Sequence, residues 1–222
     1  MKILKLILLI GFMTLLTSKV LATETPYYDQ KLVNLLSTKK IRLVVMRHGE
    51  AVHNLARLMT STKSPGIYLT AKGIDQVQGS ANKLLTAKID HIYVSPVYRT
   101  LQTAQIVGTS LQIPYQKIQV DERLREQFFG SFEDRTYEEY EAYFPSIENV
   151  YVHAVPEGES GIELFSRTHN FLHHIIRKHN NETLLLITHA YNCCQISYCL
   201  TGSYNDLPEK AEYKIYDFSE KL

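Results

Sequence analysis

The stretch Leu43-Val44-Val45-Met46-Arg47-His48-Gly49-Glu50 decides the fold of this chain. Its apolar, β-branched first half is typical of a strand buried on both faces in a parallel sheet. The run then ends abruptly in a cation, an imidazole and a glycine. Open α/β sheets bind ligands outside the carboxyl ends of their strands, so Arg47 and His48 are predicted to lie at a ligand site. The imidazole can act as a nucleophile, and the guanidinium matches the oxygens of a phosphoryl group.

Further along the chain, apolar runs alternate with segments of helical periodicity. Strands are expected at 91–94, 118–120, 184–188 and 213–218, and helices at about 70–86, 96–109, 160–178 and 190–200. This alternation predicts an α/β fold: a three-layer α/β/α sandwich with a mostly parallel central sheet. Ser95 and Pro96 have the pattern of a helix cap and first helical residue. The irregular stretch 144–158 is the best candidate for an insertion that covers the substrate.

Cationic or hydrogen-bonding side chains follow three of these strands. Arg47 and His48 end the first, Arg99 lies in the helix after the second, and His189 comes directly after the fourth. Taken singly, a solvated helix residue and a satisfied core histidine are the simpler interpretations of Arg99 and His189. A parallel sheet brings such strand ends to one edge, so together these residues predict a crevice that binds phosphate.

The first 22 residues have the pattern of a secretory signal peptide. Lys2 and Lys5 precede an apolar core at 6–16, and the segment ends in Val20-Leu21-Ala22, with small residues at its last and third-last positions. Cleavage after Ala22 would leave residues 23–222 as one domain, in a periplasmic or secreted protein. An uncleaved anchor is the alternative, although the apolar core is shorter than the ~20 residues of a membrane-spanning helix.

The charge balance gives no indication of a nucleic-acid or membrane-surface partner. The whole chain has 24 basic and 23 acidic residues, for a formal net charge of +1. Three of the lysines belong to the leader, so the mature chain has a net charge of −2. A small anionic substrate would have to be held by a local cluster of cations rather than by the whole surface. The sequence leaves the oligomeric state open.

Two groups of potential metal or disulfide ligands have simpler interpretations. Cys193, Cys194 and Cys199 lie in one predicted helix, with Cys199 too far from the other two to form a disulfide. We interpret them as small buried apolar residues, with an intermolecular bridge as a minor alternative. His169 and His173 are four residues apart on another predicted helix and could bind a metal, but a solvated helical face is the simpler interpretation. No metal or cofactor is therefore expected.

A series of motifs covers residues 43 to about 200. They are Arg47-His48-Gly49-Glu50 with Asn54, Leu69-Thr70-x-x-Gly73-x-x-Gln76, Ser95-Pro96-x-x-Arg99-x-x-x-Thr103-Ala104, Leu124-x-Glu126 with Phe129-Gly130, Gly158-Glu159-Ser160, and the strand that ends in His189. In these motifs and their order the chain resembles the histidine phosphatase superfamily, also called the phosphoglycerate mutase-like family. The resemblance implies that family's fold, a small phosphorylated substrate and no cofactor.

The resemblance also implies roles for the residues at the strand ends. His48 would be the nucleophile that becomes phosphorylated, and Arg47, Arg99 and His189 would bind the phosphoryl oxygens. In physical terms, neutral His48 attacks the phosphorus in line. Two guanidiniums and a protonated His189 offset the charge on the transferring group without a metal.

Three further residues complete the predicted site. Asn54 is expected to assist in binding phosphate, and Glu126 resembles the family's proton donor. Because Glu126 lies beside Phe128 and Phe129, we expect a raised pKa, suited to protonating the leaving alkoxide. The family usually has glycine after the second histidine. Here that residue is Ala190, whose methyl group is expected to crowd the substrate pocket slightly.

The first interpretation is a metal-independent phosphomonoesterase of the acid-phosphatase type. A phosphoglycerate-type mutase is the alternative among enzymes, although the stretch between Glu126 and His189 is shorter than in mutases of the family. The alternative from another class is a catalytically silent phosphate-binding protein on the same fold, against which intact His48 and Glu126 argue.

Overall fold

The computed structural model describes residues 28–62, 66–144, 146–203 and 208–218. The signal peptide expected at 1–22 lies outside these residues. Within the part of the chain that is described, no helix has both the length and the apolar character needed to cross a membrane.

A five-stranded sheet forms the centre of the molecule, with the strand order β3-β2-β4-β1-β5. The strands are β1 (Arg42–Arg47), β2 (His91–Val94), β3 (Ile118–Val120), β4 (Thr183–Thr188) and β5 (Tyr213–Asp217). The first four pair in parallel, and β5 pairs antiparallel with β1 at the sheet edge. The prediction of a mostly parallel sheet is confirmed.

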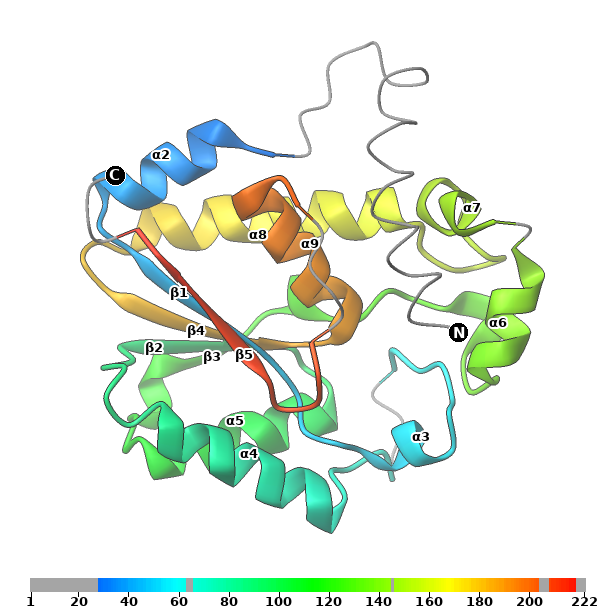
Figure 1. The fold of residues 1–222 in the computed structure, drawn as a ribbon, viewed down its shortest axis with the longest axis horizontal. Helices are drawn as coiled ribbons and strands as arrows, with labels where there is room; N and C mark the ends of the chain where they lie inside the picture. Colours follow the sequence, from blue (N-terminus) through cyan, green and yellow to red (C-terminus); the bar gives the residue numbers. More distant parts are fainter. Residues whose placement is uncertain (1–27, 63–65, 145, 204–207, 219–222) are drawn as a thin grey trace.

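Helices cover both faces of this sheet (Figure 1). One face carries α2 (Gln30–Thr38), α8 (Gly161–Lys178) and α9 (Ala190–Thr201); the other carries α4 (Ala71–Lys83) and α5 (Tyr98–Ser110). The predicted three-layer sandwich is therefore confirmed. The three cysteines are buried on α9, as predicted.

Strand β1 is buried on both sides. Leu43 and Val45 belong to the core shared with α2, α8 and α9, whereas Val44 and Met46 belong to the core shared with α4 and α5. None of these four side chains is more than 4% exposed. Each contributes roughly 1.5–3 kcal/mol of burial free energy, so β1 is fixed in register and its carboxyl end is a rigid platform.

Smaller elements lie between the main ones. They are α3 (Val52–Leu55), η1 (Tyr115–Lys117), η2 (Glu122–Leu124), η3 (Gly130–Phe132), α6 (Tyr137–Tyr143) and α7 (Ile147–Val152). The stretch expected to be an irregular insertion, 144–158, contains α7. Phe144 and Val155 from this stretch pack with Met59, Phe129 and Tyr140 in a third, smaller core.

One expected helix start is wrong. Helix α5 begins at Tyr98 with Val97 at its N-cap, and not at Ser95-Pro96. The Ser95 hydroxyl is instead 2.8 Å from Nε2 of the His189 ring. The side chain that would have capped the helix therefore takes part in the cluster at the strand ends. At the start of α4, Thr70 is the N-cap, and its hydroxyl accepts a hydrogen bond from the Gly73 amide at 3.0 Å.

Candidate active site

The register of the sheet brings the predicted histidines together. Arg47 on β1 lies opposite Thr188 on β4, so His48 and His189, one residue further on, leave the sheet at the same level. Their ring centroids are 5.2 Å apart. Arg99 reaches the same place from the first turn of α5, and its guanidinium contacts both rings. The predicted convergence of the three strand ends is confirmed.

Two hydrogen bonds define the protonation of His48. Its Nδ1 lies 2.7 Å from the carbonyl oxygen of Gly49 and donates to it, because a carbonyl can only accept. Its Nε2 accepts from Nε of Arg99 at 3.2 Å, because a guanidinium can only donate. Burial, followed by the positive charges of Arg99 and Arg47, holds the pKa of His48 well below its usual value. His48 is therefore a neutral imidazole with its Nε2 lone pair directed at Arg99.

His189 is also neutral. Its Nδ1 accepts from Nη2 of Arg99 at 3.1 Å, which leaves the proton on Nε2 to be donated to Ser95 Oγ. Burial and then the charge of Arg99 hold its pKa well below the usual value. The expectation of a protonated His189 is thus wrong for this arrangement. The physical reason is that a guanidinium already donates to the ring, which cannot carry a second proton there.

The guanidinium of Arg99 is buried and only partly satisfied. Only 1% of this residue is exposed, and Nη2 also donates to the carbonyl of Thr60 at 2.9 Å. Burial lowers the pKa of Arg99 to about 10, so it remains cationic at neutral pH. Its Nη1 is buried and has no hydrogen-bond partner among the described residues.

Two other buried N–H donors share this property, as does the Thr60 hydroxyl. Nε of Arg47 and Nδ1 of His53 are buried without a hydrogen-bond partner within the described ranges, while Arg47 Nη1 donates to Pro208 O at 2.7 Å. Arg47, His53 and Arg99 all line one pocket of about 180 Å³. Leaving a buried donor unpaired costs about 1–3 kcal/mol. Three such donors around one small pocket indicate that the pocket binds an anion, which accepts their hydrogen bonds.

Asn54 reaches the pocket but does not direct its amide into it as expected. Its Oδ1 accepts from the Ala51 amide, and its Nδ2 donates to Nε2 of His53 at 3.0 Å. The proton of His53 is therefore on Nδ1, the atom without a partner. Burial, followed by Arg99 and Arg47, lowers the pKa of His53 to about 2, so the ring is a neutral donor. Sequence reasoning missed His53, although it lies five residues after His48 and is the residue before Asn54.

Glu126 lines the same pocket, together with the aromatic residues Phe129, Tyr140 and Tyr191. It is 8% exposed, and burial raises its pKa against the opposing effects of the Gln127 amide and Arg99. Its two oxygens accept from the amides of Gln127 at 3.1 Å and Tyr191 at 3.4 Å. The predicted direction of the pKa shift is confirmed. Ala190 also lines the pocket, at the first turn of α9.

Arg167 on α8 holds the backbone that carries Glu126. It donates to the carbonyl oxygens of Arg123, Arg125 and Glu126 at 2.6–2.9 Å. It also forms two hydrogen bonds with the carboxylate of Glu159, at 2.6 and 2.8 Å. Nothing in the sequence around Arg167 indicated this role, because every partner is at least eight residues away.

Comparison with known proteins places this arrangement in a family. A sequence model of the histidine phosphatase superfamily (branch 1) matches residues 43–213. A probable phosphoglycerate mutase, GpmB, of Proteus mirabilis is 31% identical over 181 residues, covering 79% of this chain and 80% of that protein. The adenosylcobalamin/alpha-ribazole phosphatase of Escherichia coli is 30% identical, covering 67% of this chain and 73% of that protein.

Solved structures share the architecture. Bacillus stearothermophilus YhfR is 26% identical with a TM-score of 0.70, covering 79% of this chain and 90% of that chain. The mycobacterial glucosyl-3-phosphoglycerate phosphatase Rv2419c, at 20% identity and a TM-score of 0.66, has the same fold; the match covers 80% of this chain and 93% of that chain.

Proposed function

The chain belongs to the histidine phosphatase superfamily, and from this premise we propose that it hydrolyses small phosphomonoesters through a phosphohistidine on His48. The observation that carries the proposal is the neutral His48 ring, whose Nε2 lone pair faces Arg99 in a pocket that also holds the buried Glu126, with its raised pKa. The pocket of about 180 Å³ is smaller than the ~300–1,000 Å³ of typical ligand sites, which favours a small substrate.

In the first step, the phosphoryl oxygens take the hydrogen bonds of Arg99 and of the unpaired donors. Nε2 of His48 forms a bond to phosphorus, and the ester P–O bond breaks. The proton of Glu126 passes to the leaving oxygen, which departs as an alcohol. The Gly49 carbonyl, which accepts from Nδ1, stabilises the positive charge that the ring gains.

In the second step, the Glu126 carboxylate takes a proton from water. The water oxygen bonds to phosphorus as the Nε2–P bond breaks. Inorganic phosphate leaves, and both His48 and Glu126 return to their starting protonation states. One carboxyl thus serves as acid and then as base, as microscopic reversibility requires for two opposite transfers at one centre.

We propose that this chemistry is metal-independent and of the acid type. The buried guanidinium of Arg99 and the half-buried guanidinium of Arg47 supply the positive charge that offsets the charge on the transferring phosphoryl group. The first step needs Glu126 protonated, which favours mildly acidic conditions. A raised pKa extends this range upward in pH.

We also propose that the protein is exported to the periplasm or secreted. The support is the pattern of residues 1–22: two lysines, an apolar core and a site after Ala22. The N-terminal sequence of the protein recovered from cell fractions tests this. A protein that begins at residue 23 outside the cytoplasm is the expected result, and a retained Met1 in the membrane fraction would indicate the uncleaved anchor.

The decisive experiment traps the phosphoenzyme from a labelled phosphomonoester by quenching in alkaline detergent, in which the N–P bond of phosphohistidine is stable. Wild type is expected to retain acid-labile label and His48→Ala none, with turnover abolished. With labelled 4-nitrophenyl phosphate, whose leaving oxygen needs no proton, Glu126→Gln is expected to accumulate label because hydrolysis of its phosphoenzyme is slowed. Turnover that survives in His48→Ala would refute the proposal, and loss of wild-type activity in chelator would refute its metal independence.

The mutase alternative is favoured by the relationship to the probable phosphoglycerate mutase GpmB. Incubation with 3-phosphoglycerate separates the two activities. A phosphatase releases inorganic phosphate and glycerate, whereas a mutase forms 2-phosphoglycerate without net release of phosphate.

A further inference from the structure

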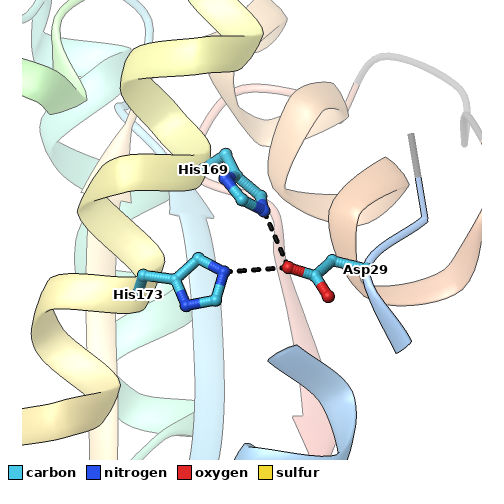
Figure 2. A group of neighbouring side chains, drawn as sticks. All are labelled: Asp29, His169 and His173. Carbon is cyan, nitrogen blue, oxygen red and sulfur yellow. Dashed lines mark hydrogen bonds and ion pairs between the residues drawn. The ribbon is translucent and has the colours of Figure 1, made fainter. Parts of the chain in front are cut away.

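Three side chains from two distant parts of the chain meet on the outer side of α8. His169 and His173 project from successive turns of this helix toward Asp29, which lies immediately before α2 (Figure 2). Nε2 of each ring lies 2.8 Å from the same carboxylate oxygen, Oδ2 of Asp29. This cluster is separate from the catalytic pocket, and the proposed phosphatase chemistry makes no use of it.

The cluster has the composition of a transition-metal site. Its three ligand atoms, two imidazole nitrogens and one carboxylate oxygen, lie within 4.8 Å of one another. Imidazole with carboxylate suits Zn²⁺ and its neighbours in the first transition series, whereas Ca²⁺ and Mg²⁺ prefer oxygen ligands throughout. Tetrahedral ligands at about 2.0–2.1 Å from Zn²⁺ are roughly 3.3 Å apart. The present 2.8 Å separations would therefore need to open by only about half an ångström.

Outer contacts already orient the ligands. Oδ1 of Asp29 accepts from the Leu32 amide at 3.0 Å, so Oδ2 is the oxygen that faces the two rings. The His169 ring stacks on Phe165 one turn earlier, with centroids 5.7 Å apart and planes inclined by 20°. Such support is characteristic of metal sites, in which neighbours of the ligands fix the ring orientation.

The charge and exposure of the ligands also fit. The carboxylate of Asp29 accepts hydrogen bonds from the Leu32 amide and from both rings, and these bonds stabilise its ionised form. The side chains of His169, His173 and Asp29 are 29%, 24% and 16% exposed. An ion can enter from solvent, and water can take the fourth position.

A second group of comparable composition does not fit in the same way. His91, His179 and Glu182 also bring three ligand atoms within 4.8 Å. Both nitrogens of the His179 ring are already used, however, at 2.7 Å from Tyr93 Oη and at 2.7 Å from Glu182 Oε2. A metal would have to break a buried hydrogen bond there, so this group is a structural network.

We propose that Asp29, His169 and His173 form a binding site for one divalent transition-metal ion, Zn²⁺ or a close neighbour. In the metal-free structure each Nε2 donates its proton to Asp29 Oδ2. On metal binding that proton is given up, and each neutral ring carries its proton on Nδ1 and supplies the Nε2 lone pair to the ion. The ion replaces two hydrogen bonds by three coordinate bonds and ties the start of α2 to α8. Its role is to stabilise the fold, so it is distinct from the proposed metal-independent catalysis.

The test uses the full mature chain, freed of metal by chelator and then titrated with Co²⁺ alone and with Zn²⁺ alone. Wild type is expected to show visible Co²⁺ absorption that saturates at one equivalent and is displaced by Zn²⁺. Zn²⁺ is also expected to raise its melting temperature. In His169→Ala and His173→Ala, affinity should fall more than the ~10–100-fold typical of losing a supporting group.

Matched variants locate the site. His174→Ala removes a neighbouring histidine of α8 that is outside the cluster, and His91→Ala removes one from the other group; both are expected to bind Co²⁺ as wild type does. Asp29→Asn keeps the size of the N-cap and removes the charge, so it should fold and bind weakly. Unfolding of a variant would show in its circular dichroism and in phosphatase activity, which is measured separately.

Absence of saturable Co²⁺ binding in wild type would overturn the proposal. So would binding that is lost in His91→Ala or retained in both His169→Ala and His173→Ala. Neither result would affect the phosphohistidine mechanism, and a failure of that mechanism would leave the metal titration unchanged.

Discussion

Replacing Arg167 by methionine tests whether the site depends on a residue that does not touch the substrate. Methionine keeps most of the apolar stem and removes five hydrogen bonds. Two of these go to Glu159, and three go to the backbone carbonyls at 123, 125 and 126. We expect the loop that carries Glu126 to lose its anchor while the sheet and the His48 cluster stay in place.

The expected loss of stability in Arg167→Met follows from the burial of the Arg167–Glu159 ion pair. The side chains of Arg167 and Glu159 are 21% and 15% exposed, and removing one partner of a buried pair costs about 3–5 kcal/mol. Glu159 keeps one hydrogen bond, from the Phe128 amide, which reduces the expected loss of stability to about 2–4 kcal/mol. General acid catalysis contributes about 10²–10⁴-fold. Because Glu126 keeps its two backbone donors, we expect part of this factor to be lost, about 10–100-fold in kcat/KM.

A comparison of kcat/KM on two substrates shows whether Arg167 positions Glu126 or only stabilises the fold. An alkyl phosphate needs its leaving oxygen protonated, whereas 4-nitrophenyl phosphate does not. Since kcat/KM reports the steps up to release of the alcohol, Arg167→Met should lose far more on the alkyl substrate. Arg135→Met, which removes an exposed ion pair with Glu139, is the matched control and is expected to change neither stability nor rate. Equal losses of kcat/KM on both substrates in a folded Arg167→Met protein would refute the reasoning.

Three further predictions concern the pocket. His53→Phe removes an unpaired donor and should raise KM about tenfold, which corresponds to the loss of one hydrogen bond to a charged group. His53→Gln should recover part of this loss. Equal KM values for wild type and His53→Phe in steady-state assays would exclude His53 from substrate binding. For an alkyl phosphate, kcat/KM should fall as pH rises through the raised pKa of Glu126, and a pH profile of Glu126→Gln should lack this fall. His48 and His189 bind fewer protons folded than unfolded, so stability should be full above about pH 6.5. Below that pH the free energy of unfolding, measured with urea, should decrease by on the order of 1.4 kcal/mol per pH unit for each of the two histidines. An unfolding free energy that does not change between pH 7 and 5 would contradict their neutral state.

The sequence was sufficient to predict the layers of the fold and the meeting of the strand ends. Both depend on periodicity and on parallel pairing, and β1 shows the reason. Four successive buried residues leave its register no freedom, so His48 must emerge at the sheet edge. The same logic placed His189 beside it.

The sequence was insufficient to predict the hydrogen-bond partner of a side chain where several partners were available. Ser95 was assigned as a helix cap, but its hydroxyl contacts His189. Asn54 was expected to face phosphate, but its amide holds His53. These outcomes depend on distances between groups far apart in the chain, to which local patterns are insensitive. Asp29 could not be paired with His169 and His173 for the same reason, since 140 residues separate it from the nearer one.

The arrangement of the catalytic pocket lowers the stability of the fold, and the same groups serve the chemistry. Two cations, Arg47 and Arg99, line one pocket with neutral histidines, and the carboxyl group of Glu126 in that pocket has a raised pKa. Three buried N–H donors there have no partner within the described parts of the chain. A fold selected for stability alone would place an ionised carboxylate among these donors. A phosphoryl group supplies both the missing acceptors and the missing charge, so the groups that cost the fold free energy are the ones that bind and activate the substrate.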